Sequence, residues 1–355
     1  MKKYTNYPLK KISWIKIGGD VKEYIEAESS EEFKSILIEK IKSKEIFEVI
    51  GWGSNTLFSD KGLDYCLIKN KALNVEVLSE KEYESSGEKI EGAEEEFTPE
   101  AVDSRHEVDK TKGTFRGIEF KDLDYDESAK ENVKVKIDSG VSLAYAMNYL
   151  IDKGITGLQW FAGIPGTIGG AIYNNIHGGT HSLSEYLSEV EVVDKDGNVN
   201  VISITELGMG YEKSRFQKSG EIIVSGTFNM KEGDKEKAKY VSIEWARRKI
   251  SQPRNSLGSV FRNISKEDQV RLGFPTPSIG YLVEHELKLS GYKVGDAMVC
   301  PTSNNFIVNL GNASSEDYLE VIRKIKSEAK SKFNLELKPE IFFKGFSDEE
   351  LKGIL

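Results

Sequence analysis

Residues 157–175 read GLQWFAGIPGTIGGAIYNN, and residues 49–60 read VIGWGSNTLFSD. Each stretch contains a glycine-rich loop, and the loop at 51–55 directly follows a short apolar run that is typical of a buried strand. Glycine has no Cβ atom, so such loops can turn backbone N–H groups toward phosphate oxygens. The hydroxyls of Ser54 and Thr167 would add donors. Tight turns explain each loop as well, so the residues alone leave turns and a phosphorylated cofactor both open.

Two common nucleotide motifs do not fit these loops. A dinucleotide-binding fingerprint requires a third glycine where this chain has Thr56, and a helix where LFSDKGLDY follows. A P-loop ends in Lys-Ser or Lys-Thr, which GIPGTIGG lacks. The loops therefore belong to another class of cofactor site, if they bind a cofactor at all.

Outward from the loops, the chain alternates between strand and helix patterns. We expect strands at FEVI before Gly51, at VKVKID, on both sides of the Asp196-Gly197 turn, and at EIIVSGTFNM. We expect helices after Ser29, over SLAYAMNYLIDKG, over 235–249 and after Ser314. The first and last of these begin with Ser-x-x-Glu or Ser-x-x-Asp, which is typical of a capping box. This mixture predicts an α+β fold.

Composition excludes several classes of protein. The 355 residues carry a net charge of −9, but 18 acidic and 8 basic side chains fall between 79 and 132, so the remainder is near neutral. We expect an acidic surface insertion there, with one hairpin around GTFRGIEF, and no basic stripe for nucleic acid. Two cysteines and four histidines without ligand spacing predict no metal site. Without a long apolar run, we expect a cytoplasmic protein that does not bind membranes.

Seven motifs in a fixed order carry a resemblance to a known family. They are IKIGG at 15–19, VIGWGSNTLFSD at 49–60, GLQWFAGIPGTIGGAIYNN at 157–175, GSVFRN at 258–263, GYLVE at 280–284, NNFIVNLGNAS at 304–314 and LELKPEI at 335–341. Together they resemble the UDP-N-acetylenolpyruvoylglucosamine reductase (UDP-N-acetylmuramate dehydrogenase) family, over almost the whole chain except the acidic segment. Phe216 leads within a few residues into EIIVSGTF, so the chain resembles the subtype without an extra substrate-capping loop.

The resemblance implies a fold and an activity. The fold is an α+β, vanillyl-alcohol-oxidase-type FAD-binding domain at 1–235, with lobes at about 1–72 and 73–235 and the acidic insertion at about 79–130. A smaller α+β domain at 236–345 would bind the UDP-sugar. The implied reaction is the FAD-dependent reduction of UDP-N-acetylglucosamine enolpyruvate to UDP-N-acetylmuramate in peptidoglycan precursor synthesis, with NADPH as co-substrate. We expect a monomer whose partner is this small molecule.

The resemblance also implies roles for individual residues. Ser259 in GSVFRN would donate a proton, and Glu340 in LKPEI would lie near the substrate carboxylate. A serine hydroxyl is a weak acid, so it would act only against a carbon that hydride addition makes basic. Substrate contacts would come from Tyr211, Ser214, Arg262 and Asn263. Cofactor contacts would come from Gly51, Trp52, Gly53, Ser54, Asn55, Gly163, Ile164, Pro165, Gly166, Thr167, Gly169, Gly170 and Ala171.

One residue departs from the family pattern. The segment YEKSRF at 211–216 has Glu212 where the family has an arginine that stabilises negative charge on the substrate carboxylate. Losing such a donor costs about 3 kcal/mol of barrier, and reversing its sign costs more. Lys213 and Arg215 are nearby cations, but strand alternation would place Arg215 on the face opposite to residue 212. Asn175-Ile-His-Gly stands where the family usually has Asn-Ala-Gly-Ala, which would place His177 and His181 near the flavin edge, and we expect them to form local hydrogen bonds.

Three hypotheses remain open from the sequence. The first is a working reductase of this family. The second is a relative that binds FAD and UDP-sugar with impaired or altered catalysis, which Glu212 favours. The third is another flavin oxidoreductase on the same fold, acting on a different anionic substrate.

Overall fold

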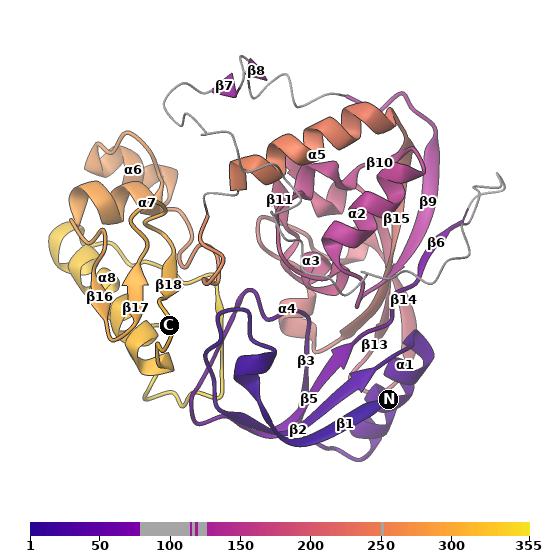
Figure 1. The fold of residues 1–355 in the computed structure, drawn as a ribbon, viewed down its shortest axis with the longest axis horizontal. Coiled ribbons are helices and arrows are strands. Elements are labelled where there is room, and N and C mark those ends of the chain that lie inside the picture. The colour runs from indigo at the N-terminus through magenta and orange to yellow at the C-terminus, as the bar shows by residue number, and fades with distance from the viewer. Residues whose placement is uncertain (79–113, 116–117, 120–125, 250–251) are drawn as a thin grey trace. The chain divides into compact units, whose positions relative to one another are not determined.

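The computed structural model describes residues 1–78, 114–115, 118–119, 126–249 and 252–355 (Figure 1). The chain forms two compact units. Unit 1 comprises Met1–Lys2, Ile25–Gly51 and Ile68–Ile250, and unit 2 comprises Lys3–Tyr24, Trp52–Leu67 and Ser251–Leu355. The content of strands and helices is α+β, as the sequence predicts. None of the described helices is long and apolar enough to cross a membrane.

A four-stranded sheet near the N-terminus includes the strand that leads into the first glycine loop. Its order is β1 (Lys2–Pro8), β2 (Asp20–Ala27), β5 (Leu63–Asn70) and β3 (Phe47–Ile50). Helix α1 (Ser30–Lys42) connects β2 to β3, and the Ser29 side chain accepts a hydrogen bond from the Glu32 amide at its start. Phe33, Ile36 and Leu37 are buried at the helical spacing seen in the sequence.

The main sheet of unit 1 is antiparallel and contains the predicted strands around the acidic segment. Its order is β14 (Val199–Ser203), β13 (Leu187–Val193), β15 (Ile222–Glu232), β9 (Asn132–Asp138) and β6 (Val75–Val77), and β10 (Ile155–Thr156) pairs with β15. The β13–β14 turn has Gly197 at φ +85°, a conformation that glycine adopts without strain. The predicted Asp-Gly hairpin is therefore confirmed.

Helices pack on this sheet and complete the core of unit 1. Helix α2 packs against α5 (Figure 1). Large side chains such as Trp160, Phe161 and Phe228 are almost fully buried between sheet and helices. The helices and short turns of unit 1 after α1 are α2 (Leu143–Asp152), η4 (Leu158–Phe161), α3 (Ile168–Asn174), η5 (Leu183–Glu185), η6 (Ile204–Glu206), α4 (Phe216–Ser219) and α5 (Lys235–Lys249), and a small hairpin joins β11 (His177–Gly178) to β12 (His181–Ser182).

Unit 2 has its own core around the C-terminal helix. The Ser314 and Asp317 side chains form the predicted capping box at its start, and Leu319, Ile322, Ile325 and Ala329 make its buried face. Strand β4 (Thr56–Phe58) pairs in parallel with β19 (Phe342–Lys344). The other elements are η1 (Leu9–Lys11), α6 (Lys266–Leu272), α7 (Ile279–Tyr281), η7 (Leu282–Glu286), β16 (Lys293–Val294), β17 (Ala297–Val299), β18 (Ile307–Asn309) and α8 (Ser315–Phe333).

Most of the predicted acidic insertion lies outside the described residues. The hairpin expected around GTFRGIEF is present as β7 (Thr114–Phe115) paired with β8 (Ile118–Glu119). At the end of the segment, Oε2 of Glu127 accepts a hydrogen bond of 2.7 Å from the Thr156 hydroxyl. Glu127 is therefore anchored to unit 1. The expected domain boundary at 235/236 coincides with the start of α5, which packs with unit 1, and the domain limits stay a prediction.

Candidate functional site

The first glycine loop leaves β3 at Gly51. A Cβ atom at Gly51 would lie 2.8 Å from Oγ1 of Thr167, so only glycine lets the second glycine loop approach this closely. Gly53 has φ +62°, in the left-handed region that favours glycine. In unit 2, the Trp52 ring stacks on Trp14 with centroids 5.9 Å apart.

The second glycine loop turns at two glycines before α3 begins. Gly163 and Gly166 have φ of +79° and +149°, and Thr167 caps α3 by accepting a hydrogen bond from the Gly170 amide at 3.3 Å. The next amides are already used, because Ile168 N–H donates to Val141 and Gly169 N–H donates to Ser139. Within 163–167, Ile164 N–H donates to the Phe161 carbonyl at 3.2 Å and Pro165 has no N–H. The candidate donors to a ligand are therefore the amides of Gly163, Gly166 and Thr167.

The predicted FAD contacts fit this local geometry. A loop that turns its N–H groups toward a phosphate needs glycines with positive φ, which Gly163 and Gly166 have, and the close contact of Gly51 with the Thr167 side chain holds the two loops together in unit 1. Ser139 packs against the start of α3 at the end of the second loop, since a Cβ atom at Gly169 would lie 2.8 Å from the Cβ of Ser139. Sequence reasoning did not single out Ser139, although it directly follows the predicted strand VKVKID.

Unit 2 brings three of the family motifs together. The Glu340 amide donates to the Val260 carbonyl at 2.9 Å, so Glu340 lies beside the residue that follows Ser259. Nδ2 of Asn55 donates to the Glu340 carbonyl at 3.2 Å, and the Phe342 amide donates to the Asn55 carbonyl at 2.9 Å. Residues 55, 259 and 340, which are far apart in sequence, are thus neighbours in one unit.

Asn305 holds the backbone just after Ser259. The Asn305 carbonyl accepts from the Val260 amide at 2.8 Å, and its side chain both accepts from the Phe261 amide and donates to the Phe261 carbonyl. Ser259 itself is half-buried. Arg262 and Asn263, the expected substrate contacts, have exposed side chains, and Oδ1 of Asn263 accepts from the Ile279 amide at 3.4 Å.

The segment around Glu212 is a turn, which corrects the strand alternation assumed from the sequence. Gly210 and Lys213 pair through two backbone hydrogen bonds, so Tyr211 and Glu212 form a two-residue loop with Glu212 at φ +48°. The Ser214 hydroxyl donates to the Tyr173 carbonyl at 2.7 Å. The physical reason is that the backbone of Gly210 pairs with that of Lys213, and the Ser214 side chain bonds to α3, so the segment turns instead of extending as a strand.

The two cations considered beside Glu212 have other surroundings. Arg215 donates through Nε and Nη2 to both carboxylate oxygens of Glu221, at 2.9 and 2.8 Å. Lys213 has an exposed side chain. His181 contacts Glu185 at 2.8 Å and stacks on Trp160, which confirms the expected local role of this histidine.

The charge of Glu212 acts on a different lysine, Lys249. Lys249, the last residue of α5, is half-buried, and burial lowers its pKa to about 8 while the charge of Glu212 raises it. Nδ1 of His177 lies 3.5 Å from Oε1 of Glu212. The sequence analysis did not single out Lys249. Its only signal was the run of three basic residues that closes a predicted helix.

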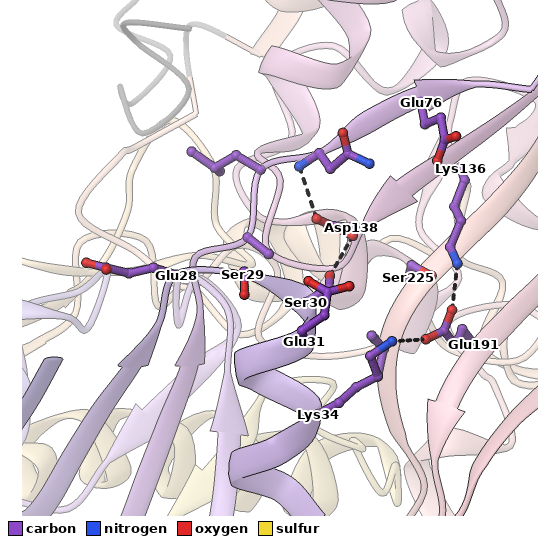
Figure 2. Close-up of a pocket in the computed structure, with 14 residues that line it drawn as sticks. Glu28, Ser29, Ser30, Glu31, Lys34, Glu76, Lys136, Asp138, Glu191 and Ser225 are labelled. Carbon is purple, nitrogen blue, oxygen red and sulfur yellow. Dashed lines mark hydrogen bonds and ion pairs between the residues drawn. The ribbon is translucent and has the colours of Figure 1, made fainter. Parts of the chain in front are cut away.

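Unit 1 also contains a polar cavity of about 330 Å³, in which Lys34 and Lys136 form ion pairs with Glu191 (Figure 2). Asp138 accepts hydrogen bonds from the Ser30 hydroxyl and the Asn74 amide, and burial raises the pKa of its carboxyl. Glu191 lies between Lys34 and Lys136, whose hydrogen bonds lower its pKa against the effect of burial. Among the described residues, none of the predicted site residues lines this cavity.

Two family models match the chain. The model described as UDP-N-acetylenolpyruvoylglucosamine reductase, C-terminal domain, matches residues 250–343. The model described as FAD binding domain matches residues 116–203, which include the second glycine loop.

Relatives with the same name cover most of the chain. UDP-N-acetylenolpyruvoylglucosamine reductase of Chlamydia abortus is 28% identical over 92% of this chain and 90% of its own length. The enzyme of Pediococcus pentosaceus is 30% identical over 64% of this chain and 74% of its own length. The crystal structure of UDP-N-acetylenolpyruvylglucosamine reductase from Thermus caldophilus is 26% identical, with a TM-score of 0.66 over 96% of this chain and 98% of that one. The chain therefore belongs to the UDP-N-acetylenolpyruvoylglucosamine reductase family of FAD-dependent oxidoreductases, with the vanillyl-alcohol-oxidase-type fold that the motifs imply.

Proposed function

We propose that this chain reduces UDP-N-acetylglucosamine enolpyruvate to UDP-N-acetylmuramate with NADPH, a step of peptidoglycan precursor synthesis. Near full-length similarity to enzymes of this name supports the proposal. FAD, when bound, carries the hydride from NADPH to the substrate. We further propose that the reaction takes place in the cytoplasm, on a monomer.

Ser259 is the proton donor in this proposal. Hydride addition to one carbon of the enolpyruvyl double bond moves an electron pair onto its neighbour, next to the carboxylate. The Ser259 hydroxyl gives its proton to that carbon, which completes the saturated lactyl group. A positioned donor of this kind contributes a factor of about 10²–10⁴ in rate. Asn305 supports the role by holding the backbone of residues 260 and 261.

Glu340 has the complementary role of stabilising the negative charge that develops at the substrate carboxylate. When electrons move toward that carboxylate, a protonated or hydrogen-bonded Glu340 lowers the energy of the enolate. Its half-buried side chain and its backbone bond to Val260 support this role. Arg262 and Asn263 follow Ser259 in the same segment, and we assign them to holding the substrate.

The observation that carries the proposal is the pair of backbone contacts around Glu340. Its amide bonds to Val260, next to the proposed acid, and its carbonyl accepts from Asn55 of the first glycine loop. Three separate motifs are gathered at one place in unit 2.

The test is a flavin spectrum followed by NADPH oxidation with and without UDP-N-acetylglucosamine enolpyruvate. We expect a yellow protein whose NADPH oxidation depends on the enolpyruvyl sugar. A colourless protein that does not take up FAD would contradict the proposal. Turnover with another acceptor, but not with this sugar, would favour a different flavin oxidoreductase.

Glu212 favours a second candidate function, a relative that binds FAD and UDP-sugar with impaired catalysis. A carboxylate at this position repels an anionic substrate unless a cation compensates for it. The variant Glu212→Arg separates the two candidates. If the chain is a working reductase with its own compensating cation, the variant leaves the rate unchanged or lowers it. If catalysis is impaired, the variant raises the rate.

A further inference from the structure

The last turn of α5 packs against the second glycine loop of unit 1. A Cβ atom at Gly163 would lie 3.2 Å from both Cβ and Cδ of Lys249 and 3.3 Å from Cα of Ala246. Gly163 also has φ +79°, which disfavours a side chain there. The glycine therefore leaves the space that the Lys249 stem occupies. Because the ammonium nitrogen is only two bonds beyond Cδ, the charge of Lys249 is held close to this loop.

The same loop has backbone donors for a phosphate group. The amides of Gly163, Gly166 and Thr167 are the candidate donors, whereas those of Ile168 and Gly169 bond within the protein. Amides at the turn before a helix present partial positive charges to an anion. Phosphate sites built from such amides commonly add one lysine, which acts as a full point charge. A lysine beside this loop is therefore in the place where such a site would use it.

Lys249 lacks a negative partner of its own. Within the described residues it forms no ion pair, whereas Arg247, on the same turn, donates to Glu244 at 2.8 Å. Burial lowers the pKa of Lys249 to about 8, and the opposing effect of the Glu212 charge is smaller. Glu212 itself has Nδ1 of His177 at 3.5 Å. The half-buried ammonium therefore costs free energy that an anion beside it would offset.

The other charged groups around α5 have neighbours elsewhere. Helix α2 packs on α5, and its Asp152 pairs with Lys235 at the opposite end of α5, at 3.5 Å. The two tyrosines of α2 stack on each other. The segments η4 and β10, which also pack on α5, have no titratable side chain. Arg248 lies over the Trp245 ring, 5.1 Å from its centroid.

We propose that Lys249 binds the diphosphate of FAD, together with the amides of the second glycine loop. The amides fix the phosphate oxygens in position, and the ammonium group adds a full charge and three N–H donors. Bound FAD in turn supplies the anion that the half-buried lysine lacks. All of these residues belong to unit 1. The inference rests on FAD binding and not on the proposed reaction, so it also holds for a relative that binds FAD without reducing the sugar.

The first measurement is the FAD affinity of the apoprotein, by fluorescence titration of the wild type, Lys249→Met, Lys249→Arg and the matched control Lys239→Met. Lys239 lies on the same helix with an exposed side chain, so its removal changes the net charge equally. For Lys249→Met we expect Kd to rise about 10- to 100-fold, the size of losing a hydrogen bond to a charged group. Lys249→Arg keeps the charge and should lose less. Lys239→Met should stay within about twofold of the wild type.

Proton uptake provides a readout that a structural role of the lysine would not change. With a pKa of about 8, about half of the lysines are neutral at pH 8 in the apoprotein, and a bound diphosphate raises this pKa. FAD binding should therefore take up about half a proton at pH 8 and about a tenth at pH 7. Calorimetry in buffers of different ionisation enthalpy measures this uptake. It should vanish in Lys249→Met and Lys249→Arg and persist in Lys239→Met.

Several outcomes would overturn the inference. One is a Lys249→Met variant that binds FAD as tightly as the wild type, and a shifted flavin reduction potential in that variant would place the lysine at the flavin ring instead. Another is wild-type proton uptake no larger than that of Lys249→Met. A wild type that takes up no FAD would contradict the inference and the proposed function together. FAD binding that depends on Lys249, without NADPH oxidation that depends on the sugar, would contradict the proposed function alone.

Discussion

At the scale of single residues, the site depends on groups whose surroundings set their chemistry. The Ser259 hydroxyl is a poor acid in water, and only a fixed position beside a carbon that becomes basic makes it useful. Lys249 is an ordinary base in water, and burial near Glu212 brings its pKa to about 8. The first effect depends on the bound substrate, and the second on residues that are distant from Lys249 in sequence.

The first prediction concerns the proposed acid. We expect Ser259→Ala to leave flavin reduction by NADPH intact and to slow reoxidation by the enolpyruvyl sugar at least about 100-fold, since general acid catalysis is lost. Stopped-flow absorbance of the flavin measures the two half-reactions separately. An equal loss in both half-reactions would contradict the assigned role.

The second prediction concerns the stability cost of the Lys249 charge. Its native pKa of about 8 lies below the value of about 10.4 expected in the unfolded chain, so burying the charged lysine costs free energy of folding. This cost has its full size below about pH 8, where the lysine is charged in both states. Between about pH 8 and 10.4 the native lysine loses its proton first, and this cost disappears. Lys249→Met should therefore raise Tm of the apoprotein at pH 7 and raise it less at pH 10. A Tm difference that is independent of pH would contradict the expectation.

At the scale of elements, the two glycine loops of the predicted cofactor site pack closely because glycine has no Cβ atom. Gly51 packs against Thr167, Gly163 against Lys249 and Gly169 against Ser139. A Cβ atom at any of these glycines would lie 2.8 to 3.2 Å from the neighbouring side chain, which is closer than an ordinary van der Waals contact. The glycines thus serve packing between elements as well as any contact with a ligand. This explains why the loops are glycine-rich although several of their amides bond within the protein.

The third prediction concerns this contact between loops. In Gly51→Ala the new Cβ would lie 2.8 Å from Oγ1 of Thr167, and relieving such a clash costs about 1–3 kcal/mol. We expect FAD affinity to fall about tenfold, measured by fluorescence titration of the apoprotein. The control is Gly210→Ala, where the nearest atom would be 3.8 Å away, and its FAD affinity should not change.

At the scale of the whole molecule, the acidity of the chain is concentrated in one segment, mostly outside the described residues. Near the end of this segment, Oε2 of Glu127 accepts hydrogen bonds from the Thr156 hydroxyl and from Nε2 of Gln159, which anchor Glu127. Sequence composition predicts that the segment before this anchor builds little core. The compact units of the described chain and the family motifs lie on both sides of it.

The fourth prediction is that deleting residues 82–121, about 40 residues, preserves FAD binding and soluble expression. The deletion removes acidic sequence and spares Glu127. The flavin spectrum and Tm of the purified variant are the measurements. Glu127→Ala serves as a comparison, and we expect it to lower Tm because the Thr156 and Gln159 side chains lose an acceptor. Insoluble deletion protein would show that the segment packs against the rest of the chain.

The sequence predicted elements better than it predicted contacts. The capped helix after Ser314, the helix at 235–249 and the Asp-Gly hairpin were all confirmed, because caps, periodicity and turn residues act over a few positions. The segment at 211–216 was wrongly treated as a strand, since nothing local reveals that Gly210 and Lys213 pair with each other. For the site, the motifs around Ser259 and Glu340 were visible, but their adjacency was not.

By itself, the sequence determined the α+β class, the order of most elements and the family, because these depend on local patterns and on motifs that survive in order along the chain. Contacts between residues far apart in sequence appear only in the folded chain: Glu340 lies beside Val260, and Arg215 pairs with Glu221. The effect of the Glu212 charge on Lys249 is of the same kind. Charge coupling depends on distance and burial in space, and a lysine 37 positions away in sequence gives no local sign of either.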